Sequence, residues 1–348
     1  MLGNVYFHSG NMEQAKIFYQ EALNVAQDDA NSWNNYGEAC REMGLWDEAE
    51  QAYEKAFSLQ ANHASALANL SALRLSQRRV EDARLLAQKA HAIAPQAPAV
   101  NKAIAAVLVA DMQFGQALRF LKGILQAVPN YTEALLLKVW FHLAKSQLKE
   151  ARFTLDHILQ TRPDMTEALL CEATLQLQLQ QPDKALEAAQ KAVADKPDFP
   201  MAHLVMASVM RNLKRYEEAH KALDVALKLA PEYVDAYALR ASLHLEQKQV
   251  EEADAALAKA QALAPDHPQV LFVKAGRHML QGEQDKSRET LQKLLEKTPD
   301  FMPALLAQAT LLNAEGNKQE AEAKLVNVLE QSPEHVTALS LLGFIYAD

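Results

Sequence analysis

The chain is poor in cysteine and has no cluster of residues suited to metal or covalent chemistry. Only two cysteines occur among 348 residues, Cys40 and Cys171, and they lie far apart. This spacing excludes a disulfide framework and a CxxC metal or redox pair. The eleven histidines form no HExxH motif and no pair four residues apart on a helix. We therefore expect no metal and no cofactor.

Signatures of catalysis and of nucleic-acid binding are also missing. The sequence has no GxSxG motif and no glycine-rich phosphate loop, so we expect no enzyme. Lys and Arg number 35 against 44 Asp and Glu, a formal net charge of -9, and no block of five like charges occurs. Binding to a phosphate backbone needs clustered cations, so nucleic acid is not an expected partner.

Long hydrophobic runs are absent as well. The first residues lack a basic segment followed by a long apolar core, and no secretory signal is visible. The most apolar run, 134–144, is interrupted by Lys138 and His142 and is shorter than the roughly 20 residues that span a bilayer. We expect no membrane insertion and, by default, a cytoplasmic protein.

What the sequence does contain is a strict period of 34 residues. Eight prolines mark it: Pro95, Pro129, Pro163, Pro197, Pro231, Pro265, Pro299 and Pro333. A fixed period of this size is typical of a repeat array in which each unit contacts its neighbours, and it argues against one central enzyme core. Each proline is expected to stop a helix, because it has no amide hydrogen to donate.

The period predicts one continuous array over 1–348. Partial repeats at 1–29 and 336–348 enclose nine full repeats, namely 30–63, 64–97, 98–131, 132–165, 166–199, 200–233, 234–267, 268–301 and 302–335. In this frame repeat position 20 is always small, Ala in nine copies and Ser287 in the tenth, and position 8 is nearly so. Apolar residues at positions 24 and 27 continue a helical stripe from position 20, and glycines at position 15 separate the halves. Each repeat is predicted to be a helical hairpin whose two helices approach closely at positions 8 and 20.

The pattern resembles the tetratricopeptide repeat (TPR) family. The copy that carries the resemblance best reads WNNYGEAC from Trp33 to Cys40, continued by Ala49, Tyr53 and Ala56, with Ala61 in place of the terminal proline. The resemblance implies an all-α solenoid, a right-handed superhelix of helical hairpins. First helices line its concave face, and function lies at their variable positions 2, 5, 9, 12 and 13. It implies no particular ligand.

Those positions are polar in the first full repeat and turn apolar from the fourth onward. The apolar set, our candidate binding residues, is Leu136, Trp140, Leu143, Leu170, Leu177, Leu204, Leu245, Phe272, Met279 and Leu306. One interpretation is a concave groove that takes an apolar segment of a protein or peptide partner, with Trp140 and Phe272 as anchors. The other is that tight curvature lets these side chains cover one another across adjacent repeats. The sequence leaves both open.

The function expected on these grounds is a noncatalytic scaffold for protein–protein interaction. The alternative is a TPR substrate-recognition arm of a larger enzyme, for example a glycosyltransferase. Asn35 and Asn69 resemble the asparagine ladder of repeats that precede O-linked N-acetylglucosamine transferases, but Ala103, Leu137 and Cys171 interrupt it. Both ends of the chain fall inside a first helix. We therefore expect a segment of a longer protein, or self-association through the C-terminal end.

Overall fold

The structure is a computed structural model that describes residues 2–77, 79–111 and 113–347. Residues 1, 78, 112 and 348, which also belong to the predicted array, lie outside the described residues. Within the described part every regular element is an α-helix and no strand occurs. The helices group into two compact units, Met1–Ala110 with Gly115–Tyr131 (unit 1) and Asp111–Phe114 with Thr132–Asp348 (unit 2). The continuity of the array across the two units stays a prediction.

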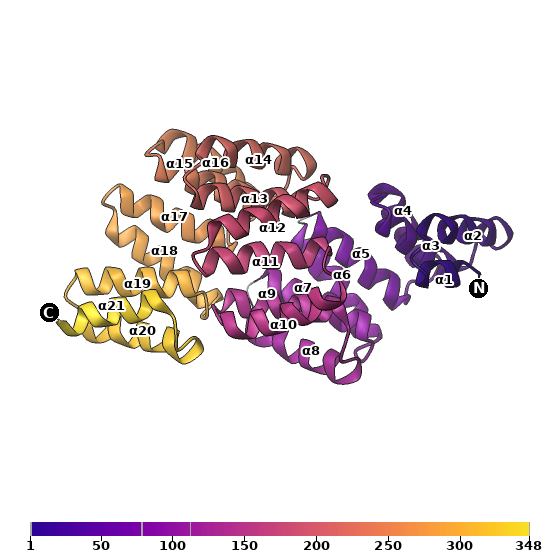
Figure 1. Ribbon diagram of the computed structural model, residues 1–348, viewed down its shortest axis with the longest axis horizontal. Coiled ribbons are helices and arrows are strands. Elements are labelled where there is room, and N and C mark those ends of the chain that lie inside the picture. Colours follow the sequence, from indigo (N-terminus) through magenta and orange to yellow (C-terminus); the bar gives the residue numbers. More distant parts are fainter. Residues whose placement is uncertain (1, 78, 112, 348) are drawn as a thin grey trace. The chain divides into compact units, whose positions relative to one another are not determined.

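Unit 1 is built from four helical pairs (Figure 1). Its helices are α1 (Leu2–His8), α2 (Met12–Val25), α3 (Ala30–Glu42), α4 (Trp46–Leu59), α5 (Ala64–Ser76), α6 (Val80–Ile93), α7 (Pro98–Ala110) and α8 (Phe114–Ala127).

Unit 2 continues the same alternation of a first helix with a second helix. Its helices are α9 (Thr132–Ala144), α10 (Leu148–Thr161), α11 (Thr166–Gln178), α12 (Pro182–Asp195), α13 (Pro200–Asn212), α14 (Tyr216–Leu229), α15 (Val234–Glu246), α16 (Val250–Leu263), α17 (Pro268–Leu280), α18 (Gln284–Lys297), α19 (Met302–Ala314), α20 (Lys318–Gln331) and α21 (Val336–Ala347).

Proline sets the ends of these helices as the sequence predicts. Each proline of the 34-residue series comes two residues after the last residue of a second helix, as Pro163 does after α10 and Pro265 does after α16. Other prolines open first helices: Pro200 and Pro268 are the first residues of α13 and α17. There a missing amide hydrogen costs nothing, because the first turn of a helix leaves its amides unpaired.

The two small-residue columns mark where the helices of a pair touch. All ten residues at position 20, from Ala15 to Ala321, are buried, with at most 1% of their surface exposed. Two hydrogen bonds join the columns directly. Ser71 Oγ, at position 8, donates to the Ala83 carbonyl at 2.7 Å, and Ser287 Oγ, at position 20, donates to the Ala275 carbonyl at 3.0 Å. The close approach predicted at positions 8 and 20 is confirmed.

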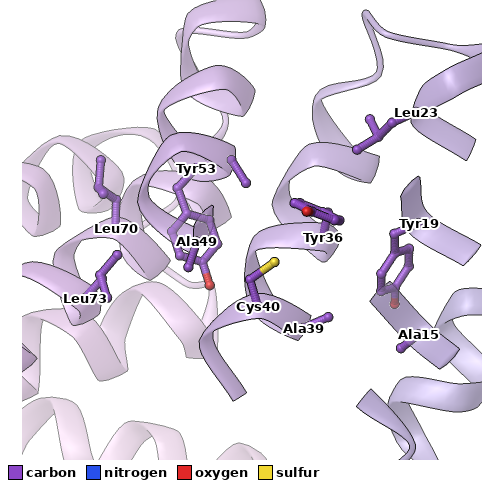
Figure 2. Close-up of a cluster of buried hydrophobic side chains, with 11 residues drawn as sticks. Ala15, Tyr19, Leu23, Tyr36, Ala39, Cys40, Ala49, Tyr53, Leu70 and Leu73 are labelled. Carbon is purple, nitrogen blue, oxygen red and sulfur yellow. The ribbon is translucent and has the colours of Figure 1, made fainter. Parts of the chain in front are cut away.

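The core of each unit is a series of clusters between consecutive helical pairs. Figure 2 shows one in unit 1, where Ala49 and Tyr53 of α4 lie between Cys40 of α3 and Leu70 and Leu73 of α5. Each cluster draws side chains from one hairpin and the next, so apolar burial, worth about 1.5–3 kcal/mol for a leucine, joins neighbouring repeats. This is the nearest-neighbour stabilisation of a solenoid.

The turn between the helices of a pair puts one residue in the left-handed region. Gly10, Gly44, Gly282 and Gly316 have φ between 74° and 85° there. In four other repeats the same position 15 holds a residue with a side chain, at φ between 50° and 61°: Ser146, Gln180, Lys214 and Lys248. The predicted turn is thus kept without glycine, at the cost of local strain.

Candidate functional site on the first helices

First helices of neighbouring repeats lie against one another in unit 2. Helix α11 contacts α9 and α13, and α15 contacts α13 and α17. Among the described elements, successive second helices make no contact of comparable extent. Closer spacing on one side of a stack puts that side on the inside of its curve, so first helices line the inner side. We call the solvent-accessible residues at positions 5, 9, 12 and 13 of α9, α11, α13, α15, α17 and α19 the first-helix surface.

The ten candidate residues divide into two groups on these helices. Leu136, Leu143, Leu170 and Leu245 are buried, with 1–9% of their surface exposed. They pack into the clusters between repeats, as Leu170 does with Val205. The other six reach solvent: Trp140, Leu177, Leu204, Phe272, Met279 and Leu306. Covering across adjacent repeats therefore accounts for four of the ten side chains, and six contribute to the first-helix surface.

The two aromatic candidates are held firmly by their surroundings. Trp140 packs against the cluster that contains Leu155 and also against the one that contains Val205. The Phe272 ring meets the buried Phe301 ring edge to face, with centroids 5.7 Å apart. Both rings are therefore partly exposed but fixed in orientation, which suits an apolar contact at little entropic cost.

Hydroxyl groups at position 9 are satisfied within their own helices. The side-chain oxygens of Thr174, Ser208 and Thr310 donate to main-chain carbonyls four residues earlier, at 2.9, 3.1 and 2.9 Å. The donor of each hydroxyl is thereby used. These hydroxyls therefore offer no free donor to a partner, and the first-helix surface is less polar than its sequence indicates.

Two features of this surface escaped the sequence interpretation. Leu280, beside Met279 at the end of α17, has 61% of its surface exposed and stands at position 13, one of the variable positions. Its place at a variable position of the repeat was the sequence signal that could have identified it as a surface residue. In addition, Arg211 of α13 pairs with Glu246 of α15 at 2.7 Å, so a charged pair interrupts the apolar series between Leu177 and Met279.

Comparisons with known proteins agree with this geometry. The family model described as the middle TPR-like domain of cilia and flagella-associated protein 70 matches residues 2–119, and the tetratricopeptide repeat model matches residues 108–170, 176–243 and 210–275. Together with the 34-residue helical hairpins, these matches decide the family. The chain belongs to the tetratricopeptide repeat family.

Solved structures resemble this TPR chain in fold at low sequence identity. The crystal structure of the APC/C hetero-tetramer Cut9–Hcn1 matches with a TM-score of 0.62 and 14% identity, covering 99% of this chain and 82% of that one. The crystal structure of yeast Tom70 gives a TM-score of 0.46 and 14% identity, covering 99% and 86%. No curated protein sequence matches the chain significantly.

The histidines of the TPR hairpins bridge their turns. His142, at the end of α9, donates from Nδ1 to Oε1 of Gln147, the N-cap residue of α10, at 2.7 Å. His244 with Gln249 and His278 with Glu283 repeat this contact at 2.8 and 2.6 Å. Hydrogen bonds from Lys286 and then from His278 hold the pKa of the Glu283 carboxyl at about 2. Burial lowers the pKa of the His142 imidazole. The histidines at position 11 are therefore structural contacts within hairpins.

The polar first helices of the unit 1 TPR hairpins are engaged with one another. Asn69 donates from Nδ2 to Asn34 Oδ1 and to Glu38 Oε1, both at 3.0 Å, and Asn34 and Asn69 are buried. Asn35 Nδ2 reaches Asn4 Oδ1 at 3.5 Å. These amides form a chain along α1, α3 and α5 that ties successive repeats together.

Other chemistry is not assembled in the described part of the TPR array. Cys40 and Cys171 are free and buried, and burial raises the pKa of both thiols, which disfavours the reactive thiolate. No three His, Cys, Asp or Glu side chains among the described residues come together as a metal site. No described helix is long and apolar enough to cross a membrane.

Proposed function

We propose that this TPR array is a noncatalytic scaffold that binds a segment of a partner protein along the first-helix surface of unit 2. The observation that carries the proposal is the exposed apolar pair Met279 and Leu280, 40% and 61% exposed, at the end of a first helix. Partly exposed Trp140 and Phe272 lie on the same series of helices. An apolar segment of the partner would cover these side chains, and exposed apolar patches of this kind mark interaction sites.

The comparisons support a role in assembly. The Cut9–Hcn1 structure, whose fold this chain resembles, is a hetero-tetramer of two kinds of protein. We extend that role to this chain and keep a cytoplasmic location as part of the proposal. Self-association through α21 is a further expectation, supported by exposed Leu339 and Phe344, whereas Ile345 on the same helix is buried. The alternative of a substrate-recognition arm of a larger enzyme stays a prediction.

A pair of matched variants tests the binding surface. Peptides are first selected from a random phage-displayed library on the wild-type chain, and their affinity is then measured for Met279→Gln and Leu263→Gln. Leu263 ends the second helix α16 and is 41% exposed, so the two substitutions remove equally exposed apolar groups, one from a first helix and one from the second helix of the preceding repeat. We expect weaker binding, about tenfold, for Met279→Gln, since a well-placed apolar contact contributes about 1–2 kcal/mol.

The control must leave affinity unchanged. Equal loss in Leu263→Gln, or no loss in Met279→Gln together with unchanged binding by a Trp140→Ser variant, contradicts the proposal. Far-UV circular dichroism of each variant confirms that the helices are retained.

A further inference from the structure

Within unit 2 the turn between α9 and α10 contacts two loops far along the chain. The ammonium of Lys145, whose side chain is 7% exposed, lies 2.8 Å from Oδ2 of Asp300 in the α18–α19 loop. It also donates to Oε1 of Gln331 at the end of α20, 186 residues away in sequence. The turn and these loops can be followed in Figure 1. A buried lysine requires such partners, because an unpaired charge is costly away from water.

Further hydrogen bonds extend this contact on both sides of Lys145. Gln147 Nε2 donates to the main-chain carbonyl of Gln331 at 2.9 Å, and the buried Ser332 donates from Oγ to the carbonyl of Ser146 at 3.1 Å. At the exposed edge, Lys149 pairs with Glu334 at 2.6 Å. His142 holds Gln147 by its Oε1 atom, so the amide is oriented toward Gln331. The contact therefore joins side chains with main chain at several points.

This contact does not follow from the repeat itself. Lys145 stands at repeat position 14, where no other repeat has a cation. The column reads Ser9, Met43, Gln77, Asp111, Lys145, Leu179, Leu213, Gln247, Gln281 and Glu315. Its acidic partner, Asp300, and the acidic partner of Lys149, Glu334, both stand at position 33. The Lys145 ammonium thus meets the Asp300 carboxylate only because repeats far apart in sequence come together within unit 2.

We propose that the contact is a latch that closes the stack of repeats in unit 2 and controls access to the first-helix surface. The joining contacts are hydrogen bonds and ion pairs, which are specific in geometry but contribute little net free energy in water. The contact between the α9–α10 turn and the two loops therefore opens far more readily than the apolar clusters between adjacent repeats. Salt screens its exposed ion pair and promotes opening.

Closure has a direct consequence for binding. Because the first helices line the inner side of unit 2, a closed stack admits a partner segment only from its ends. An open stack also admits an internal segment from the side. This gating role rests on the proposed function, whereas closure itself does not depend on any partner.

Closure is tested by cross-linking Lys149→Cys with Glu334→Cys through a short bis-maleimide. Both side chains are more than 70% exposed, and the native Cys40 and Cys171 are buried, so reagent reaches the engineered pair. Loss of one exposed ion pair leaves the Lys145 contacts in place. We expect a high yield of the intramolecular cross-link, and a low yield would overturn closure.

Charge variants then examine Lys145. Lys145→Glu and the milder Lys145→Gln should each lower the cross-linking yield several-fold, and adding Asp300→Lys to Lys145→Glu should restore it. Far-UV circular dichroism must show retained helices, and the neutral Lys145→Gln serves as the second variant if the charge reversal disturbs folding. An unchanged yield in Lys145→Gln, or failure of the charge swap to restore it, overturns the latch.

The gating role has its own measurement. The probe is the phage-selected peptide of the binding experiment, fused at both ends to folded domains so that it cannot enter by an end. We expect Lys145→Gln to raise its association rate several-fold, and the free peptide to associate equally fast with both proteins. Equal rates for the fused peptide overturn gating, whereas failure to select any peptide counts against the proposed function and leaves the cross-linking result intact.

Discussion

The ring of Tyr53 occupies the space where a side chain at Gly37 would begin. A Cβ atom built on Gly37 would lie 2.7 Å from Cε1 and 2.9 Å from Cδ1 of Tyr53, well inside any normal contact. Gly3 and Tyr19 repeat the relation one period earlier, at 2.6 Å. Tyr53 is fully buried between α3 and α5 (Figure 2). In these repeats the small residue at position 8 is thus required by the large one at position 24.

Replacing Gly37 by alanine should therefore destabilise unit 1. Overpacking costs about 1–3 kcal/mol, and the gain in helix propensity offsets at most about 1 kcal/mol of it. Gly123→Ala in α8 is the matched control, because a Cβ there meets nothing within 4 Å. We expect this control to be stabilised by up to about 1 kcal/mol. Urea titration followed by circular dichroism measures both, and a shift of the same sign in the two variants would contradict the packing argument.

Much of the fold could be predicted because its determinants recur in every repeat. First helices begin at Ala30, Thr132 and Met302, the residues at which the repeats were predicted to begin, since proline and the small columns set the register locally. Side-chain exposure at position 5 was less predictable. Leu136 is buried, whereas Leu306 is partly exposed, because exposure depends on how closely each first helix approaches the next.

The contact of Lys145 with Asp300 lay beyond sequence reasoning for a similar cause. It depends on rotation accumulated over several repeats, and small differences in each interface add up along a solenoid. No local pattern encodes that sum. The unusual lysine at position 14 was visible in the sequence, but its partner could not be inferred from it.

The turns offer a test of backbone strain. Lys248 has φ of 60° in a position where Gly282 has 75°, and its side chain is exposed. Lys248→Gly should raise the free energy of unfolding of unit 2 by about 1 kcal/mol, because a left-handed residue with a side chain is strained by about 1–2 kcal/mol and the flexible glycine returns part of that. Gly282→Ala should lower it by a similar amount. Thermal unfolding of the two variants measures both changes in stability. Stabilisation by Gly282→Ala would contradict the argument from backbone strain.

Acid should destabilise unit 2 in a window set by its histidines. Burial lowers the pKa of His142, His220 and His335 below the ordinary 6.5. The unfolded chain then binds more protons than the folded chain as pH falls below 6.5, so the free energy of unfolding decreases in that direction. The carboxyls of Asp266 and Glu283, with pKa about 2, stay charged over this window and do not contribute.

Urea unfolding at pH 7.5 and pH 5.5 measures this dependence. His142→Asn with His335→Asn should flatten it, because two of the groups that resist protonation are removed. Asparagine can still donate, as His142 does to Gln147, and accept, as His335 does from the Ala338 amide. A stability that is equal or higher at pH 5.5 in the wild type would show that the buried imidazoles do not control this range.

Two apolar truncations on first helices show which candidate residues belong to the binding surface. Leu170 is 1% exposed and packs between α11 and α13, so Leu170→Ala should lower the free energy of unfolding by about 2–5 kcal/mol through lost burial and the cavity left behind. Met279 is 40% exposed, so Met279→Ala should cost about 0.5 kcal/mol or less. If both unfold at the urea concentration of the wild type, Leu170 is not part of the core and returns to the binding surface.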